Sequence, residues 1–206
     1  MNLPNKLSML RIILIPFTLL FMLPISIFGW GPDGWNEFVS NHGMLIAAVL
    51  FIIASLTDMF DGKIARKYDL ITNLGKFLDS LADKMLVIAV LIAFVQIGRI
   101  SAWLLMIIIL REFMVTGIRM LAAEKGNVMA AKMIGKIKTV TQMIAIIYLM
   151  FEPTILKIAG EDGVYPLPVC PITVIGDILF FICVIMTVIS GLDYLLKNLD
   201  YLKNSD

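Results

Sequence analysis

The sequence predicts an all-α integral membrane protein with six transmembrane helices. Of its 206 residues, 60% are hydrophobic and only 16% are charged, whereas a soluble domain is usually near half apolar and a quarter charged. Long apolar runs follow one another, with short polar connections between them. At ~20 residues per crossing, the length fits about six spans. We therefore expect a single membrane domain over residues 1–206.

Six apolar stretches are the expected spans, and they cover residues 7–29, 43–64, 79–98, 101–123, 131–158 and 172–196. The first is read as a retained helix, because no small-residue cleavage site closes it cleanly. The middle four have charge-free cores shorter than a full span. They can cross only if their charged ends also lie at membrane depth. Such side chains are costly against lipid, so they should face one another or a polar cavity.

Lysine and arginine are distributed asymmetrically between the two sides of these spans. With the N-terminus inside, 14 of them fall inside, and only Arg99 and Lys157 fall outside. This asymmetry predicts cytoplasmic N- and C-termini and a polar cavity that opens to the cytosol. Residues 30–42 and 159–171 are then outer loops without a basic residue.

Cysteine and histidine are too few for a metal site of the zinc type. The chain has two cysteines and one histidine, His42, and their spacing matches no such site. Any metal ion would therefore be held by oxygen ligands. The net charge of +1 says nothing about partners, and no nucleic-acid partner is expected.

Four aspartates stand out in the stretch DMFDGKIARKYDLITNLGKFLDSLAD, residues 58–83. Asp58 and Asp61 are spaced i, i+3, and Asp79 and Asp83 are spaced i, i+4, so each pair shares one helix face. The polar connection between them reverses the chain and lets both faces converge. Four close carboxylates repel one another unless a cation holds them. We expect two divalent cations, Mg²⁺ or Mn²⁺, on these four side chains.

Small residues beside the aspartates leave room for a ligand. Gly62 and Ala65 share the face of Asp58 and Asp61, Arg66 follows, and Thr72 offers a hydroxyl in the connection. Metal ions, a cleared surface and a guanidinium together fit a diphosphate. Asp69 is read instead as a solvated loop residue.

The same stretch resembles the signature of the CDP-alcohol phosphatidyltransferases, D-x-x-D-G-x-x-A-R-x(8)-G-x-x-x-D-x-x-x-D. It matches at Asp58, Asp61, Gly62, Ala65, Arg66, Gly75, Asp79 and Asp83. The resemblance implies the six-helix CDP-alcohol phosphotransferase fold, commonly dimeric, in the cell membrane. It also implies two metal ions on the four aspartates, Asp83 as general base, and a CDP-diacylglycerol donor. By the same correspondence, the donor contacts are Asn5, Gly62, Ala65, Arg66, Thr72 and Gly75.

The acceptor has to be read from the rest of the chain. Arg111 and Glu112 interrupt the fourth span, and Arg119 lies two turns further along. Lys136 follows in the fifth stretch, next to Gly135. We expect Arg111, Arg119 and Lys136 to bind an acceptor phosphate. Two other interpretations stay open, an internal ion pair for Glu112 and lipid headgroup contacts for the lysines.

Two flanking segments also resemble the bacterial phosphatidylglycerophosphate synthases of this family. They are LPNKLSMLRIILIPF at the start and REFMVTGIRMLAAEKGNVMAAKMIGKIKTVTQM from Arg111 onward. The implied reaction transfers a phosphatidyl group from CDP-diacylglycerol to glycerol 3-phosphate and releases CMP. Inositol phosphate or serine as acceptor remains an alternative. A prenyltransferase with two separated acidic motifs and a divalent-cation transporter are less favoured, because all four acids gather at one end of a single helical hairpin.

Overall fold

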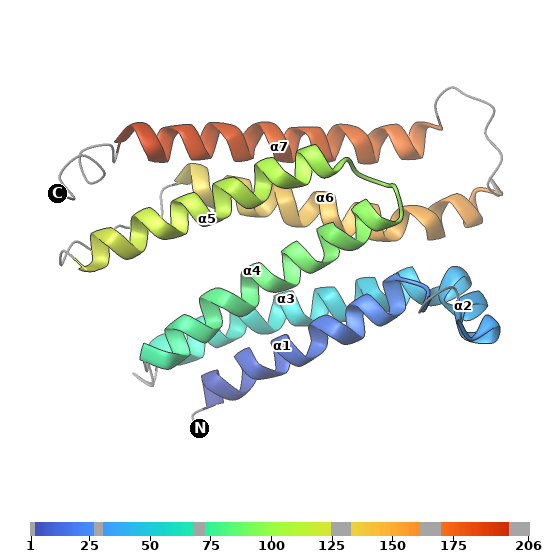
Figure 1. The fold of residues 1–206 in the computed structure, drawn as a ribbon, viewed down its shortest axis with the longest axis horizontal. Coiled ribbons are helices and arrows are strands. Elements are labelled where there is room, and N and C mark those ends of the chain that lie inside the picture. The colour runs from blue at the N-terminus through green and yellow to red at the C-terminus, as the bar shows by residue number, and fades with distance from the viewer. Residues whose placement is uncertain (1–2, 27–30, 68–72, 125–132, 161–169, 198–206) are drawn as a thin grey trace. The chain divides into compact units, whose positions relative to one another are not determined.

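The computed structural model of the protein describes residues 3–26, 31–67, 73–124, 133–160 and 170–197. Within these ranges, side chains are described except at 3–8, 58–67, 73–80, 121 and 123–124. The described backbone is helical almost throughout, without a strand, and contains six long helices (Figure 1). The predicted all-α architecture is confirmed.

The long helices follow the predicted apolar stretches in order. They are α1 (Leu3–Met22), α3 (Met44–Lys67), α4 (Asn73–Gln96), α5 (Ala102–Glu124), α6 (Met133–Ile158) and α7 (Pro171–Lys197). A short helix, α2 (Asp33–Phe38), and a π-helical turn, η1 (Val39–Gly43), lead directly into α3. Among the described residues, both the charged and the apolar parts of the predicted stretches are helical, so the charged ends lengthen the helices.

The expectation that residues 30–42 form an outer loop is wrong for the described part, because α2 and η1 are helical. The first helix also ends at Met22, earlier than predicted. Beyond it the chain is held by Asn36, whose side chain accepts a hydrogen bond from the Ile25 backbone N–H (2.8 Å) and donates one to the Ile25 carbonyl (3.1 Å). The Trp35 ring packs 5.6 Å from that of Phe21. These contacts join residues far apart in sequence, which a local pattern does not reveal.

The chain is a membrane protein by the length and composition of its helices. Among the described residues, three segments are long and apolar enough to cross a bilayer: Asp33–Thr57, Met133–Ile158 and Pro171–Lys197. Helices α4 and α5 carry charged residues within their lengths, and the described part of α1 is a shorter apolar helix, Met9–Met22. Crossing by all six helices therefore stays a prediction.

Helix α7 has the polarity of a membrane helix turned toward lipid. Its buried face includes Thr187 and Ser190, whereas Phe181 (59% exposed) and Leu196 (65% exposed) point outward. A water-exposed helix has the opposite arrangement. Lipid contact removes the cost of exposing these apolar side chains.

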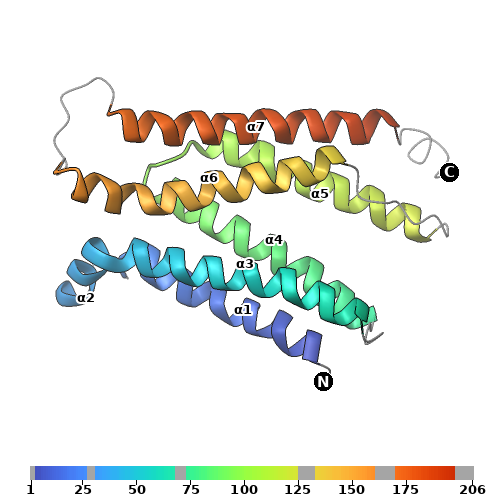
Figure 2. The ribbon, with the colours of Figure 1, turned by 180° about the vertical axis from the view of Figure 1, so that it is seen from behind.

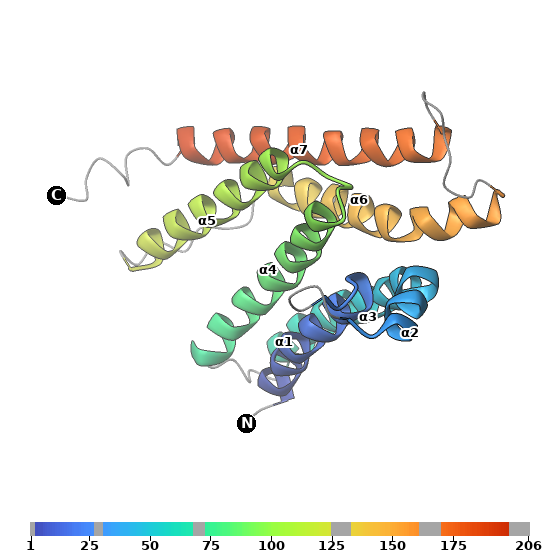
Figure 3. The ribbon, with the colours of Figure 1, turned by 45° about the vertical axis from the view of Figure 1, so that its right-hand side comes forward.

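The chain divides into two compact units, each with its own packing. The first comprises residues 1–99 and 150–162, and the second comprises 100–149 and 163–206. In the first unit, α1 packs against both α3 and α4. In the second, α5 packs against α7 (Figure 3). Helix α6 contributes its two ends to different units.

A buried ion pair fixes the far end of the first unit. Helix α4 ends in a Schellman motif, with Gly98 at φ 75° and the Arg99 N–H bonded to the Phe94 carbonyl at 2.8 Å. This turn aims Arg99 at Glu152 of α6, and the two side chains form a bidentate pair at 2.8 and 2.9 Å. The Glu152 side chain is only 5% exposed. A buried pair with two hydrogen bonds is costly to break.

Candidate functional site

Helices α3 and α4 bring the four predicted metal-binding aspartates to the same end of the first unit. Asp58 and Asp61 lie in the second half of α3, and Asp79 and Asp83 lie in the first half of α4. The two helices contact each other. The joining residues 68–72 lie outside the described residues, and Thr72 is among them.

On α3, the aspartates fall in register with the buried face. Phe51 and Ala54 are fully buried. Asp58 follows Ala54 by four residues, and Asp61 follows it by seven, which are the spacings of one helix face. The α3 positions of Asp58 and Asp61 therefore continue the stripe that packs inside the unit.

On α4, the aspartates also share a helix face with buried residues, but here they precede those residues in the sequence. Ala82 and Leu86 are buried. Asp79 precedes Ala82 by three residues and Asp83 precedes Leu86 by three, so both aspartates occupy positions on the inward face. The Asp83 side chain is described and is half-buried. Four acidic positions in register on two neighbouring helices suit a divalent cation, whose preferred ligands are carboxylate oxygens.

The other predicted donor-binding residues are placed by their backbone alone. Gly62, Ala65 and Arg66 lie on α3, Gly75 lies on α4 and Asn5 lies on α1. Their side chains are outside the described set. All five positions are helical, so their predicted spacing on helix faces is retained.

A buried arginine on α1 lies at the level of the aspartates. Arg11 is only 1% exposed and begins a buried stripe that continues through Ile15 and Thr18. The start of α1 and the α3–α4 hairpin lie at the same end of the unit (Figures 1 and 2). At about 1.5 Å per residue, Arg11, Asp58 and Asp83 are each roughly 12–15 Å along their helices from that end. The sequence pattern indicated only that Arg11 was on the inner side.

The second unit has a small, partly open recess between α5, α6 and α7. Two of the three predicted acceptor residues, Arg111 and Arg119, lie on its wall. The complete lining is Arg111, Arg119, Ile134, Gly135, Ser190, Asp193 and Tyr194. The structure therefore brings two predicted arginines together with residues of α7 that the sequence pattern did not single out.

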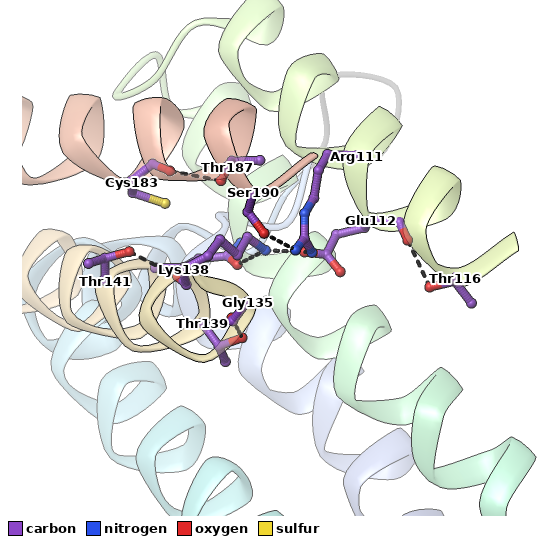
Figure 4. Close-up of polar contacts among 11 residues, drawn as sticks. Arg111, Glu112, Thr116, Gly135, Lys138, Thr139, Thr141, Cys183, Thr187 and Ser190 are labelled. Atoms are coloured by element: carbon purple, nitrogen blue, oxygen red, sulfur yellow. Dashed lines mark hydrogen bonds and ion pairs between the residues drawn. The ribbon is translucent and has the colours of Figure 1, made fainter. Parts of the chain in front are cut away.

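Arg111 is held from two sides (Figure 4). Its Nη2 donates to Ser190 Oγ at 2.6 Å, and its Nη1 donates to Glu112 Oε1 at 3.2 Å. Its side chain is 11% exposed. Glycines clear its path, because a Cβ at Gly191 would lie 3.0 Å from Arg111 Cγ and one at Gly135 would lie 3.9 Å from Nη2.

Glu112 is the acidic centre of a small internal network. Besides Arg111, it pairs with Lys138 of α6, whose Nζ also donates to Gln142 Oε1 at 2.5 Å. Lys138 is 2% exposed. The ion-pair interpretation of Glu112 is thus the one that the geometry favours, since burying these charges requires partners.

Arg119 is placed by an aromatic ring. Its Nε donates to the Tyr194 hydroxyl at 3.4 Å, and its Cζ lies 5.4 Å from the ring centroid, within cation–π range. Tyr194 is buried with Val115 and Ile118, which fixes the ring against α5.

Lys136, the third predicted acceptor residue, is exposed and is not among the residues that line the recess. Asp193, which does line it, pairs with Lys197 one turn later. Among the described residues that line the recess, Arg111 and Arg119 are cationic and Asp193 is acidic. The lining therefore carries one more positive than negative charge, which suits an anionic ligand.

Comparison with known proteins decides the family. The sequence model for "CDP-alcohol phosphatidyltransferase" matches residues 1–189. The chain belongs to the CDP-alcohol phosphatidyltransferase family. It is 43% identical to the CDP-diacylglycerol–glycerol-3-phosphate 3-phosphatidyltransferase of Bacillus subtilis over 205 residues, which cover 100% of this chain and 99% of that protein.

Proteins of the same name from more distant bacteria are also similar to this CDP-alcohol phosphatidyltransferase. The one from Rickettsia felis is 34% identical, with 94% of this chain and 93% of the relative aligned. The one from Shigella flexneri is 34% identical over the same shares. The family match ends one residue before Ser190, so the α7 residues of the recess lie just beyond it.

Proposed function

We propose that this membrane protein transfers a phosphatidyl group from CDP-diacylglycerol to glycerol 3-phosphate and releases CMP. The similarity over the full length to proteins that carry this name supports the reaction. The observation that carries the acceptor assignment is the recess in which Arg111 and Arg119 lie together with a net excess of positive charge. A phosphorylated acceptor supplies the matching anion.

The donor is proposed to bind at the aspartate end of α3 and α4. Asp58, Asp61, Asp79 and Asp83 would hold two divalent cations, Mg²⁺ or Mn²⁺, which when bound offset the charge of the diphosphate and of the leaving CMP. Their carboxylates, in register on inward helix faces, are the ligand type that such ions prefer.

Around the diphosphate, small residues and one guanidinium are proposed to contact the cytidine side of the donor. Gly62, Ala65 and Gly75 leave the helix backbones open to close approach, and Arg66 adds a charge-assisted contact. Asn5 of α1 and Thr72 of the connection complete this set.

Asp83 is proposed as the general base. Its carboxylate accepts the proton of the sn-1 hydroxyl of glycerol 3-phosphate as that oxygen attacks the β-phosphorus in line. The phosphoric anhydride bond breaks and CMP departs with the electron pair. Asp83 is half-buried at the inward face of α4. Arg111 and Arg119, with Lys136, are proposed to hold the acceptor phosphate.

The protein is proposed to act as a homodimer in the cell membrane. Both termini are proposed to be cytoplasmic, since the basic residues concentrate on one side of the spans. Both substrates then meet at the inner face, where the tails of CDP-diacylglycerol stay in lipid and glycerol 3-phosphate arrives from the cytosol.

An acceptor screen tests the reaction. Purified protein in detergent with CDP-diacylglycerol and Mg²⁺ should release CMP when glycerol 3-phosphate is added, and much less with serine or inositol phosphate. Release that depends on serine or inositol phosphate instead would reassign the acceptor. Divalent-cation flux into liposomes without CMP release would replace the enzyme by a transporter.

A further inference from the structure

Helix α7 contributes two polar side chains to the recess, and each binds one of its arginines. Ser190 is 4% exposed and accepts the 2.6 Å hydrogen bond from Arg111 Nη2. Tyr194, also 4% exposed, lies under Arg119. Both follow the end of the family match and neither belongs to the aspartate motif.

The α7 partners of the two arginines are closer together along their helix than the arginines are along theirs. Arg111 and Arg119 are eight residues apart on α5, which is about 12 Å along the helix axis, whereas Ser190 and Tyr194 are four residues apart on α7, about 6 Å. Each arginine is bound to its α7 partner, and both line the same recess. Two cations in one recess suit a shared oxyanion.

Ser190 also prevents Arg111 from pairing with Glu112 through two nitrogens. Glu112 is the residue next to Arg111 and already accepts from its Nη1 at 3.2 Å. A guanidinium free to rotate would donate from both Nη1 and Nη2 to that carboxylate. The Ser190 hydroxyl holds Nη2 away from it, while Lys138 occupies the same carboxylate from α6.

One nitrogen of the Arg111 guanidinium remains without a partner. Its Nε is buried and has no hydrogen-bond partner among the described residues. A buried donor without an acceptor is costly and calls for an explanation. A phosphate oxygen that reached this nitrogen would satisfy it.

We propose that Ser190 and Tyr194 are positioning residues for the acceptor phosphate, acting through Arg111 and Arg119. The inference rests on the proposed function, because it takes glycerol 3-phosphate as the anion that the two arginines share. Neither α7 side chain takes part in donor binding or proton transfer. Their loss weakens acceptor binding and leaves donor binding intact.

The experiment compares Ser190→Ala with Thr187→Val. Both remove a buried hydroxyl from the same face of α7, but the Thr187 hydroxyl bonds only its own helix, at the Cys183 carbonyl, and lies outside the recess. KM is measured for each substrate with the other saturating. Ser190→Ala should raise the KM for glycerol 3-phosphate about tenfold, the usual size for one hydrogen bond to a charged group. The KM of Ser190→Ala for CDP-diacylglycerol should stay within about twofold of the wild-type value. Both KM values of Thr187→Val should also stay within that limit.

Three further variants separate positioning from folding. Ser190→Thr keeps the hydroxyl and should restore most of the acceptor affinity. Tyr194→Phe keeps the ring under Arg119 and should change the acceptor KM only about twofold, whereas Tyr194→Leu should raise it about fivefold. Glycerol 3-phosphate should also raise the melting temperature of the wild-type protein more than that of Ser190→Ala, which reports binding without turnover.

The outcomes distinguish this inference from the proposed function. A wild-type protein that does not respond to glycerol 3-phosphate contradicts the proposed function. A responsive wild type with an unchanged acceptor KM in Ser190→Ala, or with equal rises in both KM values, contradicts the role of α7 alone. An equal effect of Thr187→Val would also contradict it.

Discussion

The two regions proposed to bind substrate are assembled in different ways. The aspartate end draws its acids from one stretch of 26 residues on α3 and α4. The recess draws its contacts from residues 26 to 79 positions apart, such as Lys138 with Glu112 and Arg111 with Ser190. A short motif therefore carries the proposed donor site, whereas tertiary packing creates the proposed acceptor site.

This difference has a physical consequence for each region. The spacing within each aspartate pair is fixed by helix geometry, and the contact between α3 and α4 is all that is needed to bring the two pairs together. The arginines of the recess depend on the approach of α7, which two contacts with Gly191 and Ser190 maintain. Turnover should accordingly be sensitive to single acids, and acceptor binding should be sensitive to packing.

The largest effect is expected at the aspartate end. Asp83→Asn removes the proposed base without changing side-chain volume, and turnover should fall at least about a thousandfold. Binding of CDP-diacylglycerol should be largely retained. CMP release and donor binding are measured on the same preparation. Asp177→Asn, in the apolar part of α7, is the control and should keep near-normal turnover; retained turnover in Asp83→Asn would remove Asp83 from this role.

In the recess, Arg111→Met should raise the KM for glycerol 3-phosphate about a hundredfold, because a buried guanidinium–phosphate contact is lost. Arg119→Met, at the more exposed of the two arginines, should raise the same KM about tenfold. Steady-state kinetics with each substrate varied measures both. A larger effect at Arg119 than at Arg111 would reverse the assigned importance of the two arginines.

A stability effect without a binding effect is expected at the other end of the first unit. Glu152→Gln weakens the bidentate pair with the partly buried Arg99, so it should destabilise the fold by about 2 kcal/mol, the size for hydrogen bonds to a charged group. Thermal unfolding in detergent measures the change. Lys157→Ala, which removes only an exposed contact with Asn41, should cost less than about 0.5 kcal/mol. An acceptor KM that rises in Glu152→Gln would link this pair to the recess.

The smallest effect is expected at Lys136. Its side chain is exposed and lies outside the residues that line the recess. Lys136→Ala should therefore raise the acceptor KM only about threefold, and added salt should reduce the difference. Kinetics at two ionic strengths test this. An effect as large as that of Arg111→Met would bring Lys136 into direct contact with the phosphate.

The long helices and the placement of the aspartates could be predicted from the sequence, because they depend on apolar composition and helical spacing. Apolar length predicted the long helices, and the spacing of Asp58 to Asp83 placed each acidic pair on one helix face. The helix over 33–43 escaped prediction, because its support comes from Phe21 and Ile25 of a different segment.

The α7 contribution to the recess was also hidden from a local pattern. Ser190 and Tyr194 look like ordinary residues of an apolar helix, and only contact with α5 reveals their arginine partners. Their one local signal is the i, i+4 spacing of two hydroxyl side chains near the basic end of that helix. Lys138 was noted beside Lys136, but nothing in the spacing told the buried lysine from the exposed one.

The proposal that donor and acceptor bind in separate regions is tested most directly by measuring both KM values for Arg66→Gln and for Arg111→Met. Arg66→Gln should raise the KM for CDP-diacylglycerol and leave that for glycerol 3-phosphate near its normal value, and Arg111→Met should do the reverse. If both variants raise the same constant, or if Arg111→Met affects only the donor, the assignment of donor and acceptor to separate regions is contradicted.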